Sequence, residues 1–469
     1  MSTSTAKKPT ASLKTKDILA LAFGAMIGWG WVVLAGGWLL QAGVVGTLLA
    51  FLVGGAVVIM IGLVYAEMAS AMPENGGEHV YSYRALGRKP AFICTWAIIF
   101  GYVSVVAFEA VALPTVVDYI LPSYSVGYLW TIAGWDVYFS WVMVGVIGSI
   151  AMTWINYIGV QTAALLQKTV TLLILVAGVM LITGSFFQGS IATIESPLPN
   201  GFGGTFSVLL MIPFLFIGFD VIPQAAGEMD VPKKKIGQLL VISVVVAILW
   251  YMFLSLAVAM VLDTEALKGS SLAVADTMRE IVGAEWGRTL IVFAGIAGII
   301  TSWNAFFIGG SRAIYALAES GDLPACFAKL HPKYKTPTNA ILLIGAFSTL
   351  APLMGRQSLV WLVNASGVGI IIAYIFVVYS FIVLRNKEPE MERPFKVAYG
   401  KAVAWLALAC SAGMLLLYMP FSPSALSAKE WAMVAAWFGL GGLLLALNKE
   451  SKKHSEVAAS RITQTTASE

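Results

Sequence analysis

Residues 212–223 read Ile-Pro-Phe-Leu-Phe-Ile-Gly-Phe-Asp-Val-Ile-Pro, and the fold expected for the whole chain depends on this stretch. It lies within an apolar segment near residues 205–229 that is long enough to cross a membrane. A proline inside a helix removes a hydrogen bond and clashes with the carbonyl four residues earlier. With two prolines, Gly218 and Asp220, the stretch predicts a membrane helix that is broken near mid-depth.

A second unusual stretch, residues 24–31, reads Gly-Ala-Met-Ile-Gly-Trp-Gly-Trp in the first apolar segment. Each glycine destabilises a helix interior by roughly 0.8–1.0 kcal/mol relative to alanine. Unwound backbone is tolerated in a membrane only where it lines a cavity. Gly24 and Gly28 also fit a helix-packing face. The second interruption favours broken helices, because paired breaks are typical of inverted repeats with a midplane site.

The composition indicates a membrane protein. Of the 469 residues, 59% are hydrophobic and 12% are charged, whereas soluble domains have about half and about a quarter, respectively. About 20 apolar residues form one span, which predicts twelve transmembrane helices. They run near residues 17–44, 45–72, 91–121, 137–156, 159–186, 205–229, 236–262, 286–318, 337–355, 358–384, 402–420 and 430–448.

The distribution of basic residues predicts the orientation. By these boundaries, 22 of the 29 Lys and Arg lie on the side that holds both termini, five lie on the opposite side, and Lys168 and Arg312 lie within or beside helices. Cytoplasmic loops carry the excess of positive charge, so both termini are expected in the cytoplasm. The polar start, residues 1–16, lacks the pattern of a signal peptide, and residues 449–469 read as a disordered tail. The three cysteines show no metal spacing, and no nucleic-acid footprint is present.

Several motifs together resemble the amino acid–polyamine–organocation permeases, over about residues 14–450. The strongest is Phe216-Ile217-Gly218-Phe219-Asp220 followed by Ala225-Ala226-Gly227-Glu228 and Pro232-Lys233-Lys234. Supporting matches are Pro73, Gly76-Gly77, Tyr81, Tyr83, Gly87, Ser311 to Ala316, Gly321, Pro324, Thr336-Pro337 and Arg393-Pro394-Phe395.

The resemblance implies an all-α integral membrane protein with a LeuT-like fold. Two inverted repeats of five helices, residues 17–186 and 205–384, are followed by two further helices within 402–448. The implied function is alternating-access transport of an amino acid or amine in the bacterial inner membrane. By resemblance, the substrate lies against Ile27, Gly28, Trp29, Gly30 and Trp31, and against Phe216, Ile217, Gly218, Phe219 and Asp220.

Two features depart from the family pattern. Trp29 and Trp31 stand where most relatives have small or aliphatic residues. Their indoles either make the pocket smaller, or form an aromatic face for a cation, worth roughly 0.5–2 kcal/mol, or point away from the pocket and pack. In addition, the position of a coupling lysine in many proton-driven relatives is Ile174 here. Thr301 and Ser302 match a hydroxyl pair of sodium-coupled relatives, so proton, sodium and exchange coupling remain open.

Three acids within predicted spans are candidates for a functional role, because a charge there is costly and usually faces a cavity. Glu109 is expected either to bind a cationic group or proton or to serve as a structural hydrogen-bond partner. Asp220 is expected to contact substrate ammonium or a proton, or to cap the broken helix. Glu67, nearer the cytoplasmic end of its span, is expected to pair with basic loop residues or gating residues rather than to belong to the site. Trp303, Phe306 and Phe307 are pocket candidates that also fit packing.

Other functional classes lack their motifs. The chain has no nucleotide-binding loop for a pump, no catalytic cluster for an enzyme and no repeated pore loop for a channel. No cofactor or metal is expected apart from a coupling proton or sodium ion. A substrate-sensing receptor on the same fold remains an alternative to a transporter. The expected partners are a small cationic or neutral amine-bearing solute and the lipid bilayer, and the oligomeric state is left open.

Overall fold

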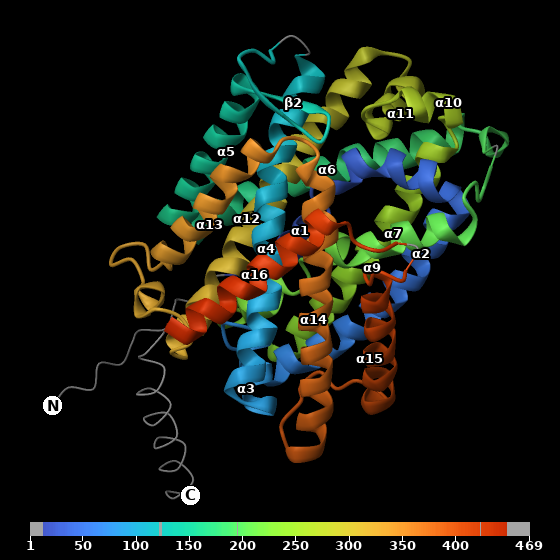
Figure 1. The fold of residues 1–469 in the computed structure, drawn as a ribbon. Helices are drawn as coiled ribbons and strands as arrows, with labels where there is room; N and C mark the ends of the chain where they lie inside the picture. The colour runs from blue at the N-terminus through green and yellow to red at the C-terminus, as the bar shows by residue number, and fades with distance from the viewer. Residues whose placement is uncertain (1–12, 122–123, 195, 423, 448–469) are drawn as a thin grey trace, which may run out of the picture.

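The computed structural model describes residues 13–121, 124–194, 196–422 and 424–447, and it is mainly helical (Figure 1). Within these residues, nine helices are long and apolar enough to cross a membrane. The predicted C-terminal tail at 449–469 and most of the N-terminal tail lie outside the described ranges.

The first half of the chain contains six helices and a small hairpin. The elements are α1 (Thr15–Met26), α2 (Gly30–Ala71), α3 (Glu78–Leu86), α4 (Arg88–Ile120), β1 (Tyr128–Ile132), β2 (Trp135–Tyr138), α5 (Phe139–Ile158), α6 (Val160–Gln188) and the short η1 (Ile191–Thr193).

The second half contains the remaining helices. They are α7 (Gly201–Phe216), α8 (Val221–Gln224), η2 (Ala226–Glu228), α9 (Lys233–Ala259), α10 (Thr264–Gly269), α11 (Ala273–Val282), α12 (Glu285–Glu319), η3 (Ala325–Ala328), α13 (Thr338–Leu350), η4 (Ala351–Met354), α14 (Ser358–Lys387), α15 (Gly400–Leu417) and α16 (Ala428–Leu447).

Both predicted interruptions are present as non-helical backbone. α1 ends at Met26 and α2 begins at Gly30, while α7 ends at Phe216 and α8 begins at Val221. α2 itself bends at Gly43, whose φ of 68° is not helical. A straight helix of 42 residues would extend about 63 Å at 1.5 Å per residue, twice the hydrocarbon thickness. The bend therefore divides α2 into two segments near the predicted boundary at 44/45.

A two-stranded antiparallel hairpin between α4 and α5 departs from the all-α expectation. Tyr128 pairs with Tyr138 and Thr131 with Asp136, and Ala133 and Gly134 form the turn with positive φ. The strands contain aromatic and β-branched residues, which favour extended backbone. The expected span from residue 137 begins where this hairpin ends.

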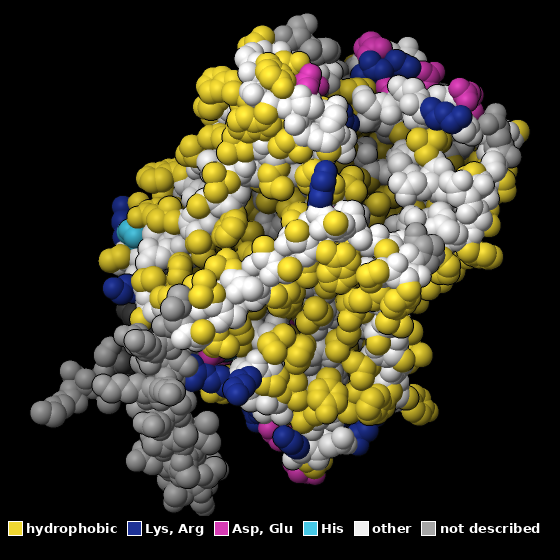
Figure 2. All heavy atoms as spheres, viewed as in Figure 1, with side chains coloured by type: hydrophobic (Ala, Val, Ile, Leu, Met, Phe, Trp, Pro, Cys, Tyr) yellow, Lys and Arg dark blue, Asp and Glu magenta, His cyan; other side chains and the backbone are white. Residues whose placement is uncertain are grey.

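The burial of the helices separates a central group from a peripheral one. The most apolar window of α4 is 94% buried and that of the α7–α8 segment is 89% buried, against 33% for α6 and 28% for α15. α5 presents Ile147, Ile150 and Trp154 outward at helical spacing. Figure 2 shows hydrophobic side chains over the middle of one face, with most charged side chains toward its ends. This arrangement suits a bundle surrounded by lipid.

Candidate functional site

The two helix breaks lie directly against each other. Gly218 has a φ of 131°, and a Cβ atom at this position would lie 2.8 Å from Ala25 Cβ and 3.0 Å from the Met26 backbone nitrogen. Only glycine combines this backbone conformation with such a close approach. The break between α7 and α8 is thereby held against the end of α1.

A small cavity lies beside the breaks. Its volume is about 20 Å³, which has room for about one water molecule. Its lining residues come from six helices and the first break: Ala25, Met26, Gly28, Gly30, Val105, Phe108, Glu109, Phe214, Leu215, Tyr251, Ser302 and Phe306. Of the residues expected at the substrate or coupling site, Gly28, Gly30, Glu109 and Ser302 line it, as does the pocket candidate Phe306.

Glu109 is the acidic group of this cavity. Its side chain is 2% exposed, and Ser302 on α12 donates a hydrogen bond to Glu109 Oε1. Glu109 Oε2 has no hydrogen-bond partner among the described residues. A Cβ on Gly28 would lie 2.7 Å from Ser302 Oγ and 2.9 Å from Glu109 Oε1. The carboxyl group and hydroxyl therefore touch the unwound backbone at the first break.

Tyr251 on α9 also faces the breaks, and sequence reasoning missed it. Its hydroxyl donates a hydrogen bond of 2.6 Å to the backbone oxygen of Met26, the last residue of α1. Its ring stacks on Phe51 at 5.2 Å and lies 5.5 Å from Phe216. A polar hydroxyl in the middle of an apolar span is the signal that would have identified it. Phe216 packs against the rings of Phe51 and Tyr251 and does not line the cavity.

The two tryptophans of the first break are buried outside the cavity lining. Trp29 packs against α12, where a Cβ on Gly295 would lie 1.8 Å from the indole ring. Trp31 packs edge-on against Trp250 of α9, with ring centroids 5.8 Å apart. Ile27, which precedes them in the break, is also fully buried. In this conformation the two indoles pack between helices and do not face the cavity.

The second break places its side chains on the side of α2, α4 and α14. Asp220 is fully buried, and its Oδ1 accepts a 2.7 Å hydrogen bond from the Gly218 backbone nitrogen. Phe219 packs against Tyr65 and Tyr374, with ring centroids 5.3 and 5.6 Å away. A Cβ on Gly101 of α4 would lie 2.7 Å from Ile217 Cδ1. Asp220 thus braces the broken backbone, and its Oδ2 has no hydrogen-bond partner in the described chain.

The remaining coupling candidate, Thr301, contacts α1. Its hydroxyl lies 3.1 Å from the Gly24 oxygen and 2.9 Å from the Gly298 oxygen. Ile174, where the sequence analysis looked for a coupling lysine, is buried. Lys168 lies nearer the start of α1 and forms a 2.6 Å ion pair with Asp17.

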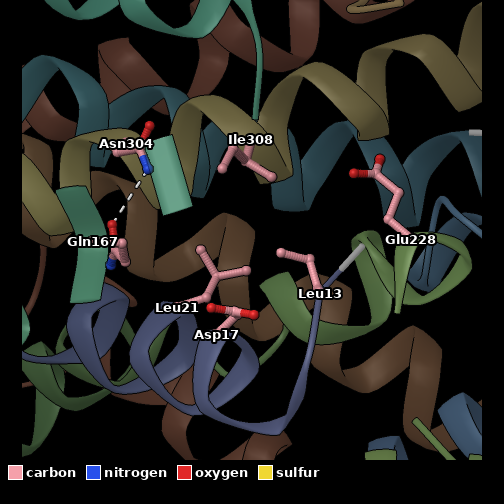
Figure 3. Close-up of a pocket in the computed structure, with 7 residues that line it drawn as sticks. All are labelled: Leu13, Asp17, Leu21, Gln167, Glu228, Asn304 and Ile308. Carbon is pink, nitrogen blue, oxygen red and sulfur yellow. Dashed lines mark hydrogen bonds between the residues drawn. The ribbon is translucent and has the colours of Figure 1, made fainter. Parts of the chain in front are cut away.

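A second small cavity, of about 10 Å³, lies between α1 and α12. Figure 3 shows Asp17 and Leu21 of α1 opposite Asn304 and Ile308 of α12, with Glu228 at one end. Asn304 bonds to Gln167 of α6 at 3.3 Å. Near this cavity, Arg312 of α12 makes a bidentate contact with Glu228 at 3.0 and 3.2 Å. Two ion pairs, Lys168–Asp17 and Arg312–Glu228, therefore close this end of the bundle.

Two other sequence candidates lie away from the cavity. Trp303 Nε1 donates to Ser348 of α13 at 3.2 Å, on the far side of α12. Glu67 is 1% exposed and accepts bonds from Arg385 at 2.7 and 2.6 Å, with Arg393 at 3.1 Å. The expectation that Glu67 pairs with basic loop residues is confirmed.

Comparisons with known proteins agree with this architecture. A family model described as "Amino acid permease" matches residues 13–443. The chain is 27% identical to the branched-chain amino acid permease BcaP of Bacillus subtilis, covering 87% of this chain and 88% of that one. It is 25% identical to the aspartate-proton symporter of the same organism, covering 93% and 89%. It is 26% identical to the Bacillus subtilis methylthioribose transporter, covering 96% of each chain.

Proposed function

Because the chain belongs to the amino acid permease family, we propose that it is a secondary transporter of an amino acid or related organic amine. It moves the solute across the membrane by alternating access and leaves it chemically unchanged. The observation that carries the proposal is the contact between two broken helices, at Gly218 and Ala25, beside a buried cavity that contains Glu109. Freed backbone groups at such breaks bind ammonium and carboxylate groups of a solute.

The proposed topology has twelve spans. α1 with the part of α2 before Gly43 forms the first span, and the rest of α2 forms the second. The repeats at residues 17–186 and 205–384 then place the two breaks five spans apart, and the helices within 402–448 are appended. The matched extent of the family model, residues 13–443, supports a single unit of this kind.

The proposed location is the inner membrane of a bacterial cell, with both termini in the cytoplasm. The excess of Lys and Arg on the side of the termini supports this orientation. The ion pairs Lys168–Asp17 and Arg312–Glu228 would then form the cytoplasmic closure.

Substrate binding requires movement, since a cavity of about 20 Å³ is smaller than any amino acid. The amino group of the solute is proposed to meet Glu109 Oε2, which has no partner among the described groups. Freed backbone groups of the residues 27–29 and 217–220 supply further hydrogen bonds. Release to the cytoplasm requires α1 to separate from α6 and α12, which breaks the Lys168–Asp17 pair.

Transport is driven by a proton or a sodium ion, or it proceeds as exchange of one solute for another without a driving ion. Thr301 and Ser302 lie near α1, as a sodium site would require, but both hydroxyls already bond to protein oxygens. The name of one relative, the aspartate-proton symporter, supports proton coupling as the first case to test.

Uptake by the purified full chain in proteoliposomes tests the proposal. The panel contains radiolabelled leucine, aspartate, lysine and methylthioribose, with imposed pH or sodium gradients. The expected result is accumulation or exchange of one solute, which Gly28→Ala strongly reduces. Specific binding without accumulation or exchange would instead favour a receptor without turnover.

A further inference from the structure

A pair of buried carboxyl groups lies outside the cavity. Glu78 is the first residue of α3, and Asp220 lies in the break between α7 and α8; both are 0% exposed. In the described chain neither takes part in an ion pair, whereas the buried acids Glu67, Glu228 and Asp322 do. Two isolated buried carboxylates are strongly unfavourable unless a proton or cation neutralises them.

Tyrosine hydroxyl groups surround the pair. Those of Tyr65 on α2, Tyr102 on α4 and Tyr374 on α14 interact electrostatically with both carboxyl groups. None of the three hydroxyls makes a hydrogen bond of acceptable geometry with a described group. Glu78 Oε1 and Asp220 Oδ2 lack one as well. Tyr65 nevertheless lies within hydrogen-bonding reach of Glu78, and Tyr102 of Asp220, so the hydroxyl groups are polar partners of the two carboxyl groups.

The other titratable groups near Glu78 carry no compensating positive charge. Tyr81 and Cys94 also interact with Glu78, and the exposed Glu74 acts on Tyr81. The neighbouring His79 is neutral at physiological pH, because burial lowers its pKa to about 4. Its Nδ1 lies 3.1 Å from the Thr95 hydroxyl.

We infer that Glu78 and Asp220 form a proton-binding pair, in which one proton taken from one aqueous side neutralises one of the two carboxyl groups and is later released to the other side. This inference rests on the proposed transport function and assigns the coupling ion to a specific site. A hydroxyl can donate to a carboxylate or accept from a protonated carboxyl, so the tyrosines stabilise both states of the pair.

A proton suits the geometry better than a metal cation. Gln224 of α8 directs its amide Nε2–H group, a hydrogen-bond donor, at Glu78 Oε2. A metal cation bound at the same oxygen would repel this N–H group. The Tyr65 ring packs 5.8 Å from Tyr374 and 6.5 Å from Tyr81. No cluster of three or more metal-binding side chains occurs among the described residues.

The pair links the second helix break to the helix that precedes α4. The Gly76 backbone nitrogen donates to the Gln224 oxygen at 3.2 Å, and a Cβ on Gly77 would lie 3.2 Å from the Gln224 nitrogen. Loss of the proton places two negative charges across this contact, and their repulsion favours separation of α3 from α8. Burial also raises the pKa of Glu78, which lies outside the membrane-spanning segments, and the Asp220 carboxylate raises it further.

Infrared pH-difference spectroscopy of the full chain in detergent tests proton binding without any solute. The expected result is a protonated-carboxyl band that persists at neutral pH, is lost at alkaline pH, and is absent in Glu78→Gln and reduced in Asp220→Asn. Glu74→Gln, in the loop before α3 and exposed, should retain the band. A wild-type band in both Glu78→Gln and Asp220→Asn would overturn the inference.

Comparison of the melting temperature in sodium chloride with that in choline chloride decides whether the pair binds a proton or a metal cation. Equal melting temperatures for the wild type in the two salts are expected. Stabilisation by sodium that disappears in Glu78→Gln would replace the proton site with a cation site.

Proteoliposomes containing a pH-sensitive dye test coupling, with leucine, aspartate and lysine as probes. Glu78→Gln should reduce proton movement per transported solute to background, and Glu74→Gln should keep the wild-type ratio. An unchanged ratio in Glu78→Gln would contradict the coupling role. If no probe is transported, the proposed function fails while the infrared result still decides proton binding.

Discussion

At the scale of single residues, the site depends on close approaches of the backbone. Gly218 requires glycine both for its φ of 131° and for its contact with α1, and Gly28 admits the Glu109–Ser302 pair. These contacts leave almost no space for added atoms, because protein interiors are packed as densely as crystals.

Gly28→Ala is expected to reduce uptake at least about 10-fold, because the new methyl group would displace Ser302 and Glu109 from the break. Initial rates in proteoliposomes, corrected for the amount of folded protein, measure the effect. Gly37→Ala is the matched control, since a Cβ at Gly37 would meet no atom within 4 Å. Equal loss of uptake in both variants would contradict this explanation.

His79 is expected to make stability depend on pH. Burial lowers its pKa to about 4, from a usual value of 6.5. As the pH falls below about 6.5, the unfolded chain takes up a proton that the folded chain does not, so stability decreases until the folded pKa is reached. The decrease amounts to roughly 3 kcal/mol.

The melting temperature of His79→Gln should therefore fall less than that of the wild type between pH 7 and pH 4. Glutamine keeps a hydrogen-bonding group toward Thr95 and does not titrate. If the two proteins showed the same pH dependence, His79 would not be its source.

At the scale of elements, the broken helices are held by contacts between helices and not by their own hydrogen bonds. Tyr251 of α9 holds the end of α1 by a 2.6 Å bond to Met26, and Arg312 of α12 holds η2 through Glu228. Because these partners belong to separate helices, the breaks can act as hinges when the contacts exchange.

Arg312→Met is expected to destabilise the protein by roughly 3–5 kcal/mol, because it leaves Glu228 as a buried charge without its partner. The Arg312 and Glu228 side chains are only 8% and 11% exposed. Arg84→Met is the matched control: its pair with Glu388 is 50% and 33% exposed, so about 1 kcal/mol or less is expected. Thermal unfolding in detergent ranks the two, and similar losses would refute the difference in burial as the cause.

At the scale of the whole molecule, the distribution of charge and apolar surface defines how the bundle lies in a membrane. Outward apolar residues such as Leu172 and Val176 on α6 cover its sides, with 62% and 54% of each exposed. Transfer of this surface from water to lipid is favourable, and the basic residues then determine which end faces the cytoplasm.

The orientation predicts which cysteine a membrane-impermeant maleimide reaches. Cys326 in η3 is exposed, whereas Cys94 is buried. In a Cys410→Ala background, Cys326 should be labelled in inside-out vesicles and protected in right-side-out vesicles. Ala133→Cys, at the exposed hairpin turn, should show the opposite pattern when Cys326 is also replaced by alanine. Reversed labelling would overturn the proposed orientation.

Much of the fold was predictable because membrane insertion imposes simple requirements on sequence. Long apolar segments, and interruptions at residues 24–31 and 212–223, are local properties that composition reveals directly. The hairpin at 128–138 was missed because short strands give a weak signal. At the site, Glu109 was identified as an acid within a span, but its partner Ser302 was considered only as a sodium ligand.

The sequence by itself determined the membrane class, the helical architecture and the two breaks, because each depends on residues that are neighbours along the chain. Only the tertiary structure decided which polar groups meet. Ser302 and Glu109 are 193 positions apart, and Glu67 and Arg385 are 318 apart. It also directed Trp29 and Trp31 into helix contacts and brought Glu78 to Asp220, because the helix packing that brings distant segments together sets where each side chain points.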